Sequence, residues 1–413
     1  MIQKSHRLES VHYEIRGPLV EQAQRLEQAG HKILRLNIGN PAPFGFHTPA
    51  PLMEEITTRL AEAQGYVDTR GLRAAREAIC DAFGRRGIRD LSPDDLFIGN
   101  GVSEMILMCT QGLLNPGDEV LIPAPDYPLW TSAVRLAGGR AVHYHCDEAA
   151  GWLPDLDEME SRITDRTKAL VVINPNNPTG AVYPPDLLAD LARLAERRGL
   201  VVFADEIYDQ LTYEGVRHHP LAGFVHDTLC VTFNGLSKNY RAAGFRTGWA
   251  ILSGARWKAA SYVEGITTLA SMRLCGNVPT QLAVARALAD PSSAQELVLP
   301  QGRLRRQRDL CYEKLSAMPG VSVVKPKGAF YMFPRLDPDY YPITDDRAFM
   351  LEVLRRTHVL FVQGTGFNWP TPDHLRVVYL PDVDLLADAL DRFAAFLEEY
   401  RARAARPAVP VKS

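Results

Sequence analysis

The sequence predicts an α/β protein: a three-layer αβα large domain with a mostly parallel sheet, plus a smaller α+β domain. Two observations support this fold class. Between about residues 95 and 251, short apolar runs alternate with helical segments, which is typical of a parallel sheet sandwiched by helices. After that stretch, further short strands lie between two long helices, which indicates a second, smaller unit.

The predicted strands of the large domain are apolar throughout, as expected for strands buried on both faces. They are residues 96–98, 120–122, 141–144, 170–173, 200–204, 230–233 and 249–252. Residues 186–198 between two of them have amphipathic helical spacing and end at Gly199. Ligands bind at the carboxyl ends of such strands, so polar motifs that follow them are candidate site residues.

The two ends of the chain predict the smaller domain. Helical spacing is found in residues 18–34, where Gly30 stops the pattern, and in residues 302–318 and 384–400. The short strands expected between the last two helices are residues 321–324, 330–333, 359–362 and 375–380. We therefore expect a large domain at residues 46–290, a small domain from residues 1–45 and 291–413, and a frayed tail from Arg401.

Composition excludes several classes of protein. The 413 residues carry a net charge of -3, and no basic excess points to nucleic acid. No apolar run approaches the ~20 residues of a membrane span, and the N-terminus lacks an apolar signal core. The six cysteines are scattered without a C-x-x-C pair, which favours a cytoplasmic protein with reduced thiols and no metal site.

A lysine and an arginine follow the predicted strand at 230–233. Lys238 stands after Asn234-Gly235-Leu236-Ser237, and Arg246 lies eight residues later between glycines. An amine at a strand end can form a Schiff base with an aldehyde cofactor. A nearby guanidinium can bind the phosphate of that cofactor.

Four further motifs stand at expected strand ends, and each has a structural alternative. Gly101, Val102 and Ser103 open a helix whose free N–H groups suit phosphate, although they also fit a simple tight turn. The turn Asn174–Gly180 fixes the Asn177 amide as a hydrogen-bond donor, or is only a rigid turn.

The other two motifs supply a carboxylate and aromatic rings. A carboxylate such as Asp205 after an apolar strand needs a cation, for which a protonated pyridine nitrogen is suitable, unless it only caps a helix. Tyr208 shares its turn, and Tyr127 lies on a proline-rich loop where it either stacks on a planar ring or packs in the core. Together with Lys238, these groups make an electron sink for an amino acid that loses its Cα proton, with the freed lysine as the base.

The order and spacing of Asn177-Pro178-Thr179-Gly180, Asp205-x-x-Tyr208 and Ser237-Lys238 with Arg246 resemble pyridoxal-phosphate-dependent aminotransferases of fold type I, class I and II. The resemblance covers almost the whole chain. Residues 36–46, 234–249 and 271–275 are similar to the bacterial glutamate–pyruvate (alanine) branch of that family. It implies amino-group transfer between L-alanine and 2-oxoglutarate, pyridoxal 5′-phosphate as cofactor, and a homodimer with shared active sites.

The resemblance also implies residue roles. Lys238, Asp205 and Tyr127 are expected to be catalytic, and Gly39, Asn177 and Arg376 to meet the amino-acid substrate. The expected cofactor contacts are Gly101, Val102, Ser103, Tyr127, Asn177, Asp205, Tyr208, Ser237, Lys238 and Arg246, with Tyr66 reaching the phosphate of the neighbouring subunit. Gly235 departs from relatives that have a serine there, so Ser103 and Ser237 must supply the phosphate hydroxyls.

The partner of the second carboxylate of glutamate is left open between Arg16, with Tyr13 beside it on the same N-terminal loop, and Arg273. The same electron-sink residues also fit an aminotransferase of another amino-acid specificity or a C–S lyase, because these reactions begin from the same carbanion. A regulatory binding protein of this fold is disfavoured, since no DNA-binding segment is visible in the sequence.

Overall fold

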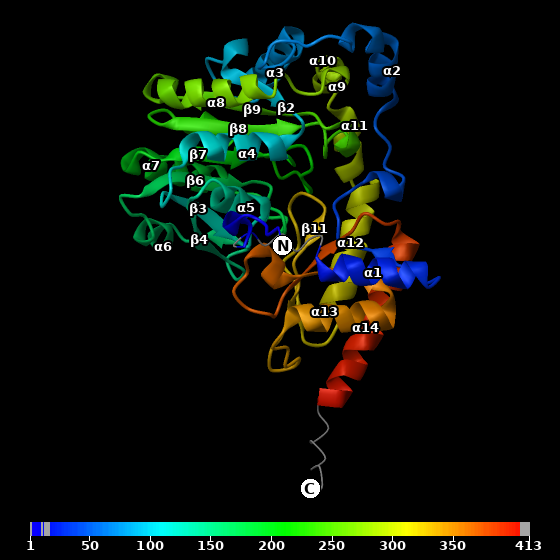
Figure 1. Cartoon of the computed structure of the whole chain (residues 1–413). Helices are drawn as coiled ribbons and strands as arrows, with labels where there is room; N and C mark the ends of the chain where they lie inside the picture. The colour runs from blue at the N-terminus through cyan, green and yellow to red at the C-terminus, as the bar shows by residue number, and fades with distance from the viewer. Residues whose placement is uncertain (1, 10, 12–16, 405–413) are drawn as a thin grey trace.

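A computed structural model describes residues 2–9, 11 and 17–404 of the chain (Figure 1). A wide sheet with helices on both faces fills one part of the molecule, and a second helical part lies beside it around α12–α14. We call this second part, residues 291–404 together with α1 and β1, the C-terminal region. Among the described residues, no helix has the length and apolar character needed to cross a membrane.

The large sheet has eight strands in the order β2-β9-β8-β7-β6-β3-β4-β5. Its strands are β2 (Leu96–Gly99), β3 (Glu119–Ala124), β4 (Arg140–Asp147), β5 (Leu153–Pro154), β6 (Thr167–Ile173), β7 (Val201–Asp205), β8 (Leu229–Gly235) and β9 (Gly248–Gly254). The five strands from β8 to β4 pair in parallel, while β9 is antiparallel to both β8 and β2. The sheet is thus mostly parallel, as predicted, with its connections on both faces.

Helices cover both faces of the sheet because its central strands are buried on both sides. One apolar cluster joins the sheet to α4 (Val102–Leu113), α5 (Leu129–Leu136) and α8 (Ala260–Met272). The opposite cluster joins it to α3 (Arg73–Arg85), α6 (Leu156–Ser161), α7 (Pro185–Arg198) and α10 (Val284–Ala289). In α7, Pro185 occupies the first turn and Gly199 closes the helix at φ 63°, the left-handed conformation that glycine adopts without strain.

The C-terminal region packs around its own apolar core. Its helices are α1 (Pro18–Gln28), α11 (Ser292–Val298), α12 (Arg303–Ser316), α13 (Asp346–Thr357) and α14 (Val383–Ala404). Its strands are β1 (Leu34–Arg35), β10 (Val321–Ser322), β11 (Tyr331–Met332), β12 (Arg335–Leu336), β13 (Val359–Leu360), β14 (Val362–Gln363) and β15 (Leu375–Val378). The three-stranded sheet β11-β15-β14 is antiparallel, and β1 pairs in parallel with β13.

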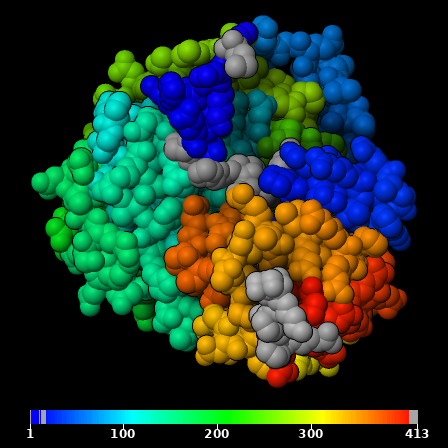
Figure 2. All heavy atoms as spheres, turned by 60° about the horizontal axis from the view of Figure 1, so that its bottom comes forward, coloured from blue at the N-terminus to red at the C-terminus, as the bar shows by residue number. Residues whose placement is uncertain are grey.

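Short elements complete the described chain. They are α2 (Ala50–Arg59), α9 (Val278–Gln281) and the 3-10 helices η1 (His6–Leu8), η3 (Ala42–Phe44), η4 (Leu60–Ala63), η5 (Pro93–Asp95), η6 (Leu221–Gly223), η7 (Ala243–Phe245), η8 (Arg256–Ala259) and η9 (Gly364–Phe367). In Figure 2, the orange surface of the C-terminal region lies directly against the teal surface of the sheet part. The two parts are therefore in direct contact, and residues of both line the cavity described below.

One local prediction agrees with the structure and one differs from it. The first helix ends at Gln28, just before Gly30, which takes φ 92° and stops the helix as predicted, and the chain then forms β1. The predicted strand at 359–362 is two strands, β13 and β14, which belong to different sheets. A continuous apolar run does not reveal where a strand changes its partner.

Candidate active site

A cavity of about 830 Å³ opens where the carboxyl ends of the parallel strands face the C-terminal region. It collects most of the predicted site residues from eight separate segments of the chain. They are Gly39, Val102, Ser103, Tyr127, Asn177, Asp205, Tyr208, Ser237, Lys238, Arg246 and Arg376. Each of the motifs from the sheet follows its strand, so the parallel topology brings them to one edge.

Lys238 lies in this cavity just beyond β8. Its Nζ donates a hydrogen bond to the backbone oxygen of Gly39, at 2.7 Å. Enclosure of the amine, helped by the positive charges of Arg376 and Arg246, lowers its pKa to about 8, against the opposing effect of Asp205. An amine with this pKa is neutral in a large fraction of molecules near pH 8, which suits a nucleophile and a base.

We expect this pKa to govern the reactivity of the amine in the protein without cofactor. Below pH 8, the rate of Lys238 arylation by an amine-directed reagent such as trinitrobenzenesulfonate should rise about tenfold per pH unit, and it should level off above pH 8. The sign follows because only the neutral amine reacts. Peptide mapping of the labelled protein across pH 6–11 measures the rate, with exposed Lys258 as the internal control. A midpoint near 10.5 at Lys238 would contradict it.

Asp205 ends β7 with its carboxylate buried; its side chain is 3% exposed. The indole Nε1–H of Trp130 donates to Oδ2 at 3.0 Å, which fixes the orientation of the carboxylate. Burial raises the pKa of Asp205 to about 6, while the bond from Trp130 opposes this rise. A buried carboxylate of this kind is stabilised by a cation, and a protonated ring nitrogen supplies one.

The opposite end of the cavity suits a phosphate. Gly101 caps α4 at φ 88° without a side-chain hydrogen bond, so the first N–H groups of the helix lack a side-chain cap. Arg246 crosses over this glycine: a Cβ added at residue 101 would lie 2.4 Å from its Nη2. Ser103 and Ser237 also line the cavity. Helix amides, two hydroxyls and a guanidinium form a donor set that fits the phosphate of pyridoxal phosphate.

Arg376 lies on β15, between two aromatic rings. Its guanidinium carbon is 4.6 Å from the ring centroids of both Tyr331 and Phe367. Nη1 donates to the side-chain oxygen of Asn177 at 2.9 Å, and Nη2 donates to the backbone oxygen of Asn37. Although only 2% exposed, Arg376 lines the cavity, so a planar cationic fork is held there for a carboxylate.

Tyr331 is a site residue that the sequence motifs did not indicate. Its hydroxyl is 2.7 Å from that of Tyr208, and a Cβ added at Gly39 would lie only 2.0 Å from it. Tyr331 thus connects the predicted ring contact to the predicted substrate contact. In the sequence it reads as one more apolar residue of a short strand, and neither its spacing nor its neighbours distinguish it.

Two predicted residues that the structure describes, Tyr66 and Arg273, lie away from the cavity lining. Tyr66 is 81% exposed and does not line the cavity. Arg273 pairs with Glu104 at 2.8 Å and donates to two backbone carbonyls. Because it does not line the cavity, its guanidinium is poorly placed to bind the distal carboxylate of a substrate there. Tyr13 and Arg16 fall outside the described residues.

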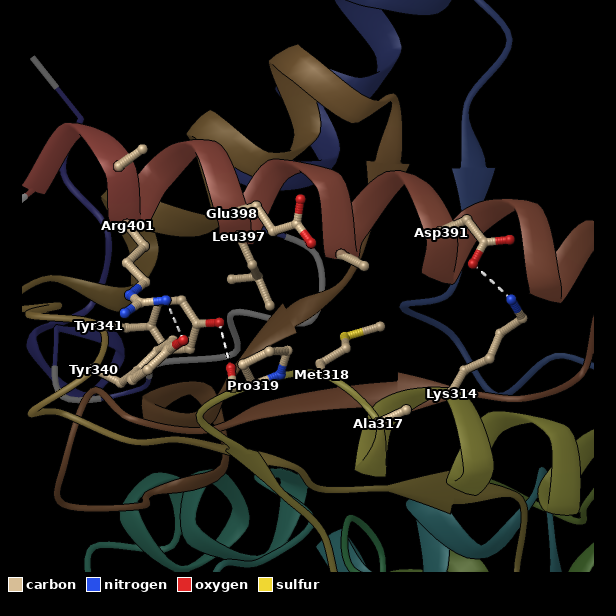
Figure 3. A pocket seen from close by; sticks show the side chains of 12 residues that line it. Lys314, Ala317, Met318, Pro319, Tyr340, Tyr341, Asp391, Leu397, Glu398 and Arg401 are labelled. Carbon is tan, nitrogen blue, oxygen red and sulfur yellow. Dashed lines mark hydrogen bonds and ion pairs between the residues drawn. The ribbon is translucent and has the colours of Figure 1, made fainter.

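A second cavity, of about 600 Å³, lies between α12 and α14 (Figure 3). Four of its polar side chains form pairs: Lys314 with Asp391 at 2.6 Å, and Arg401 with the Tyr340 hydroxyl. None of the predicted site residues that the structure describes lines it, whereas most of them line the cavity around Lys238.

Comparison with known proteins identifies close relatives. Residues 31–393 match the family described as aminotransferase class I and II. The chain is 52% identical over 399 residues to the glutamate-pyruvate aminotransferase AlaA of Escherichia coli K12, covering 97% of this chain and 98% of that protein. It is 54% identical over 399 residues to an alanine aminotransferase of Mycobacterium tuberculosis H37Rv, covering 96% and 93%.

A solved structure agrees with these sequence relatives. The crystal structure of an aminotransferase from Escherichia coli superposes with a TM-score of 0.96 at 52% identity, covering 97% of this chain and 99% of that one. The predicted α/β fold class is therefore confirmed. The likeness extends over both the sheet part and the C-terminal region.

Proposed function

Because the chain belongs to the class I and II aminotransferases, we propose that it exchanges an amino group between L-alanine and 2-oxoglutarate, giving pyruvate and L-glutamate by a ping-pong mechanism with pyridoxal 5′-phosphate. The observation that carries this proposal is the convergence of Lys238, Asp205 and Arg376 on one cavity. Sequence identities of 52–54% with glutamate-pyruvate and alanine aminotransferases favour alanine as the amino donor.

In this proposal, Arg376 and Asn177 hold the α-carboxylate of the substrate, and the backbone of Gly39 borders the same place. The aromatic rings of Tyr331 and Phe367 enclose the planar Arg376 guanidinium, hold its orientation and exclude water from it. The carboxylate of the amino acid is thereby fixed, and its Cα is held near Lys238.

Lys238 has two tasks: it holds the cofactor covalently between reactions, and its free amine then moves the proton at the substrate Cα. With the cofactor bound, Asp205 would keep the ring nitrogen protonated, Tyr127 would contact the ring, and Tyr208 and Asn177 would bond the ring oxygen. The N-terminus of α4, Arg246, Ser103 and Ser237 hold the phosphate. When bound, pyridoxal phosphate supplies the electron sink that stabilises negative charge on Cα.

A half-reaction tests the function directly. The yellow holoenzyme is mixed with single amino acids, and conversion to the aminated cofactor is followed by absorbance. Rapid conversion with L-alanine and L-glutamate is expected, followed by recovery with pyruvate or 2-oxoglutarate. No spectral change with either amino acid would refute the proposed specificity. Release of pyruvate from cystathionine without any oxo acid would indicate a C–S lyase instead.

We propose that Arg16, with Tyr13 beside it, contacts the distal carboxylate of glutamate. The basis is a lone arginine before the Gly17-Pro18 break, in a segment that leads to the site-bordering residue Gly39. Arg16→Ala is expected to raise the KM for glutamate about 10- to 100-fold and the KM for alanine less than threefold, since alanine lacks the second carboxylate. Steady-state kinetics with both donors measure this. An equal loss for both substrates would contradict the assignment.

We also propose a homodimer in which Tyr66 serves the phosphate site of the partner subunit. Tyr66 is 81% exposed, and the apolar side chains of Leu60 and Met272 are also exposed, at 52% and 77%. Tyr66→Ala and Lys238→Ala chains, each nearly inactive alone, are expected to regain about a quarter of wild-type activity when unfolded and refolded together.

The gain follows because half of the mixed dimers are hybrids, and each hybrid contains one site with both native residues. Mixing either variant with itself is the control. An inactive mixture that nevertheless forms hybrid dimers, shown by affinity tags of two kinds, would place Tyr66 outside the partner's site.

A further inference from the structure

A partly buried contact joins the loop after β3 to the end of η9, across the boundary between the sheet part and the C-terminal region. Asn368 Nδ2 donates to Asp126 Oδ1 at 2.7 Å, although the two residues are 242 positions apart in sequence. Beside it, the backbone N–H of Asp126 donates to the backbone oxygen of Phe367 at 3.0 Å. Asp126 thus makes one side-chain and one backbone hydrogen bond to two adjacent residues, Asn368 and Phe367.

The residue types at this contact suit their positions. Asp126 is fully buried, and its Oδ2 accepts a hydrogen bond from the Thr131 hydroxyl at 2.7 Å. Asn368 closes η9 at φ 56°, a left-handed conformation that asparagine adopts more readily than most residues. Asparagine therefore suits this position for two reasons: the residue tolerates the left-handed backbone, and its side-chain amide donates to a buried carboxylate.

Both ends of η9 are tied, but to different parts of the molecule. At its start, the backbone N–H and the hydroxyl of Thr365 donate to Asp346 on α13, at 2.9 and 2.8 Å. At its end, Phe367 and Asn368 bind Asp126, which precedes the predicted ring-stacking residue Tyr127. The short helix η9 therefore connects α13 of the C-terminal region to the loop that carries Tyr127 at the cavity.

The position of η9 affects the substrate-binding arginine because Phe367, the last residue of η9, carries one of the two rings that enclose the Arg376 guanidinium. Phe367 is fully buried, so a shift of η9 moves its ring against the arginine. We propose that Asn368 is a positioning residue: through Asp126 it fixes Phe367, and through Phe367 it fixes Arg376 for the substrate carboxylate. This role rests on the proposed function, in which Arg376 holds that carboxylate.

The variant Asn368→Gly tests the role, because glycine keeps the left-handed backbone and removes only the side chain. The matched control is Thr371→Val in the next loop. That change removes the hydrogen bond from the Thr371 hydroxyl to Asp373, at 2.6 Å, which stays within the C-terminal region.

In the stopped half-reaction, Asn368→Gly is expected to raise the apparent Kd for L-alanine about tenfold, the effect of losing one hydrogen bond to a charged group. The limiting rate should change less than threefold, and Thr371→Val should behave as wild type. A fall in the limiting rate without a change in Kd, or equal effects in both variants, would overturn the positioning role.

Hydrogen exchange gives a measurement that needs no substrate. Pro125 and Pro128 lack amide protons, so the chain between them contributes only the amides of Asp126 and Tyr127. In the holoenzyme, Asn368→Gly should accelerate exchange there about tenfold, and Thr371→Val should leave it unchanged. Unchanged exchange in Asn368→Gly would overturn the coupling. If no amino acid reacts with the wild type, the proposed function fails, while this measurement still decides whether η9 is held through Asn368.

Discussion

Replacing Lys238 by alanine is expected to lower kcat for exchange between alanine and 2-oxoglutarate by at least about 10³-fold. The amine both holds the cofactor and moves the Cα proton, and loss of a positioned acid–base group alone costs roughly 10²- to 10⁴-fold. Coupled-assay kinetics measure kcat, and the absorbance spectrum of the purified protein reports the covalent attachment.

The matched control is Lys258→Ala, since Lys258 lies on the exposed η8 and pairs with Asp227 at 2.6 Å. That variant should keep wild-type kcat and spectrum. The fold should survive in Lys238→Ala, because the enclosure that lowers the pKa of Lys238 to about 8 shows that the native state disfavours its charged form. Retention of more than a tenth of wild-type kcat would show that another group moves the proton.

Replacing Asp205 by asparagine is expected to lower kcat about 10²- to 10³-fold while leaving KM for alanine within about threefold. The amide has the shape of the carboxylate and can keep the Trp130 hydrogen bond, but it has no charge with which to hold a proton on the ring nitrogen. Loss of one preorganised electrostatic contact in a buried site has about this cost.

Stability separates this chemical role from a structural one. Burial raises the pKa of Asp205 to about 6, above its value in an unfolded chain, so its ionisation destabilises the folded protein without cofactor as pH rises through about 6. Asp205→Asn should therefore unfold at the same or a higher temperature than wild type at pH 8, without cofactor. The control Glu119→Gln changes a buried carboxylate at the far end of β3 and should affect Tm but not kcat. A normal kcat in Asp205→Asn would refute the role.

Much of the fold and of the site follows from local patterns. The central strands are recognisable because burial on both faces leaves apolar runs such as 170–173 and 200–204. Candidates such as Asn177 and Asp205 are recognisable because they stand at the ends of such runs, and parallel pairing carries both to the same edge. Both steps need only short stretches of sequence.

The remaining features depend on contacts between distant segments. An apolar run does not indicate whether a strand pairs in parallel or antiparallel with its neighbours, so the antiparallel direction of β9 is visible only in the structure. Tyr331 and Trp130 look like core aromatics until their hydroxyl and indole N–H are seen to face Tyr208 and Asp205. The contact between Asp126 and Asn368 leaves no periodic pattern at all.

The direction of β9 has a consequence for how the site tolerates change during evolution. Because β9 runs against β8, it begins at the edge where β8 ends, and residues 236–247 connect the two strands without crossing the sheet. Lys238 and Arg246 both lie in this single connection, whereas Asn177 and Asp205 follow separate parallel strands, whose connections must return to the opposite edge of the sheet. Insertions in a crossover helix can be absorbed at the opposite edge, but an insertion between 238 and 246 changes the separation of amine and guanidinium directly. The length of this one loop therefore sets the distance between the two groups.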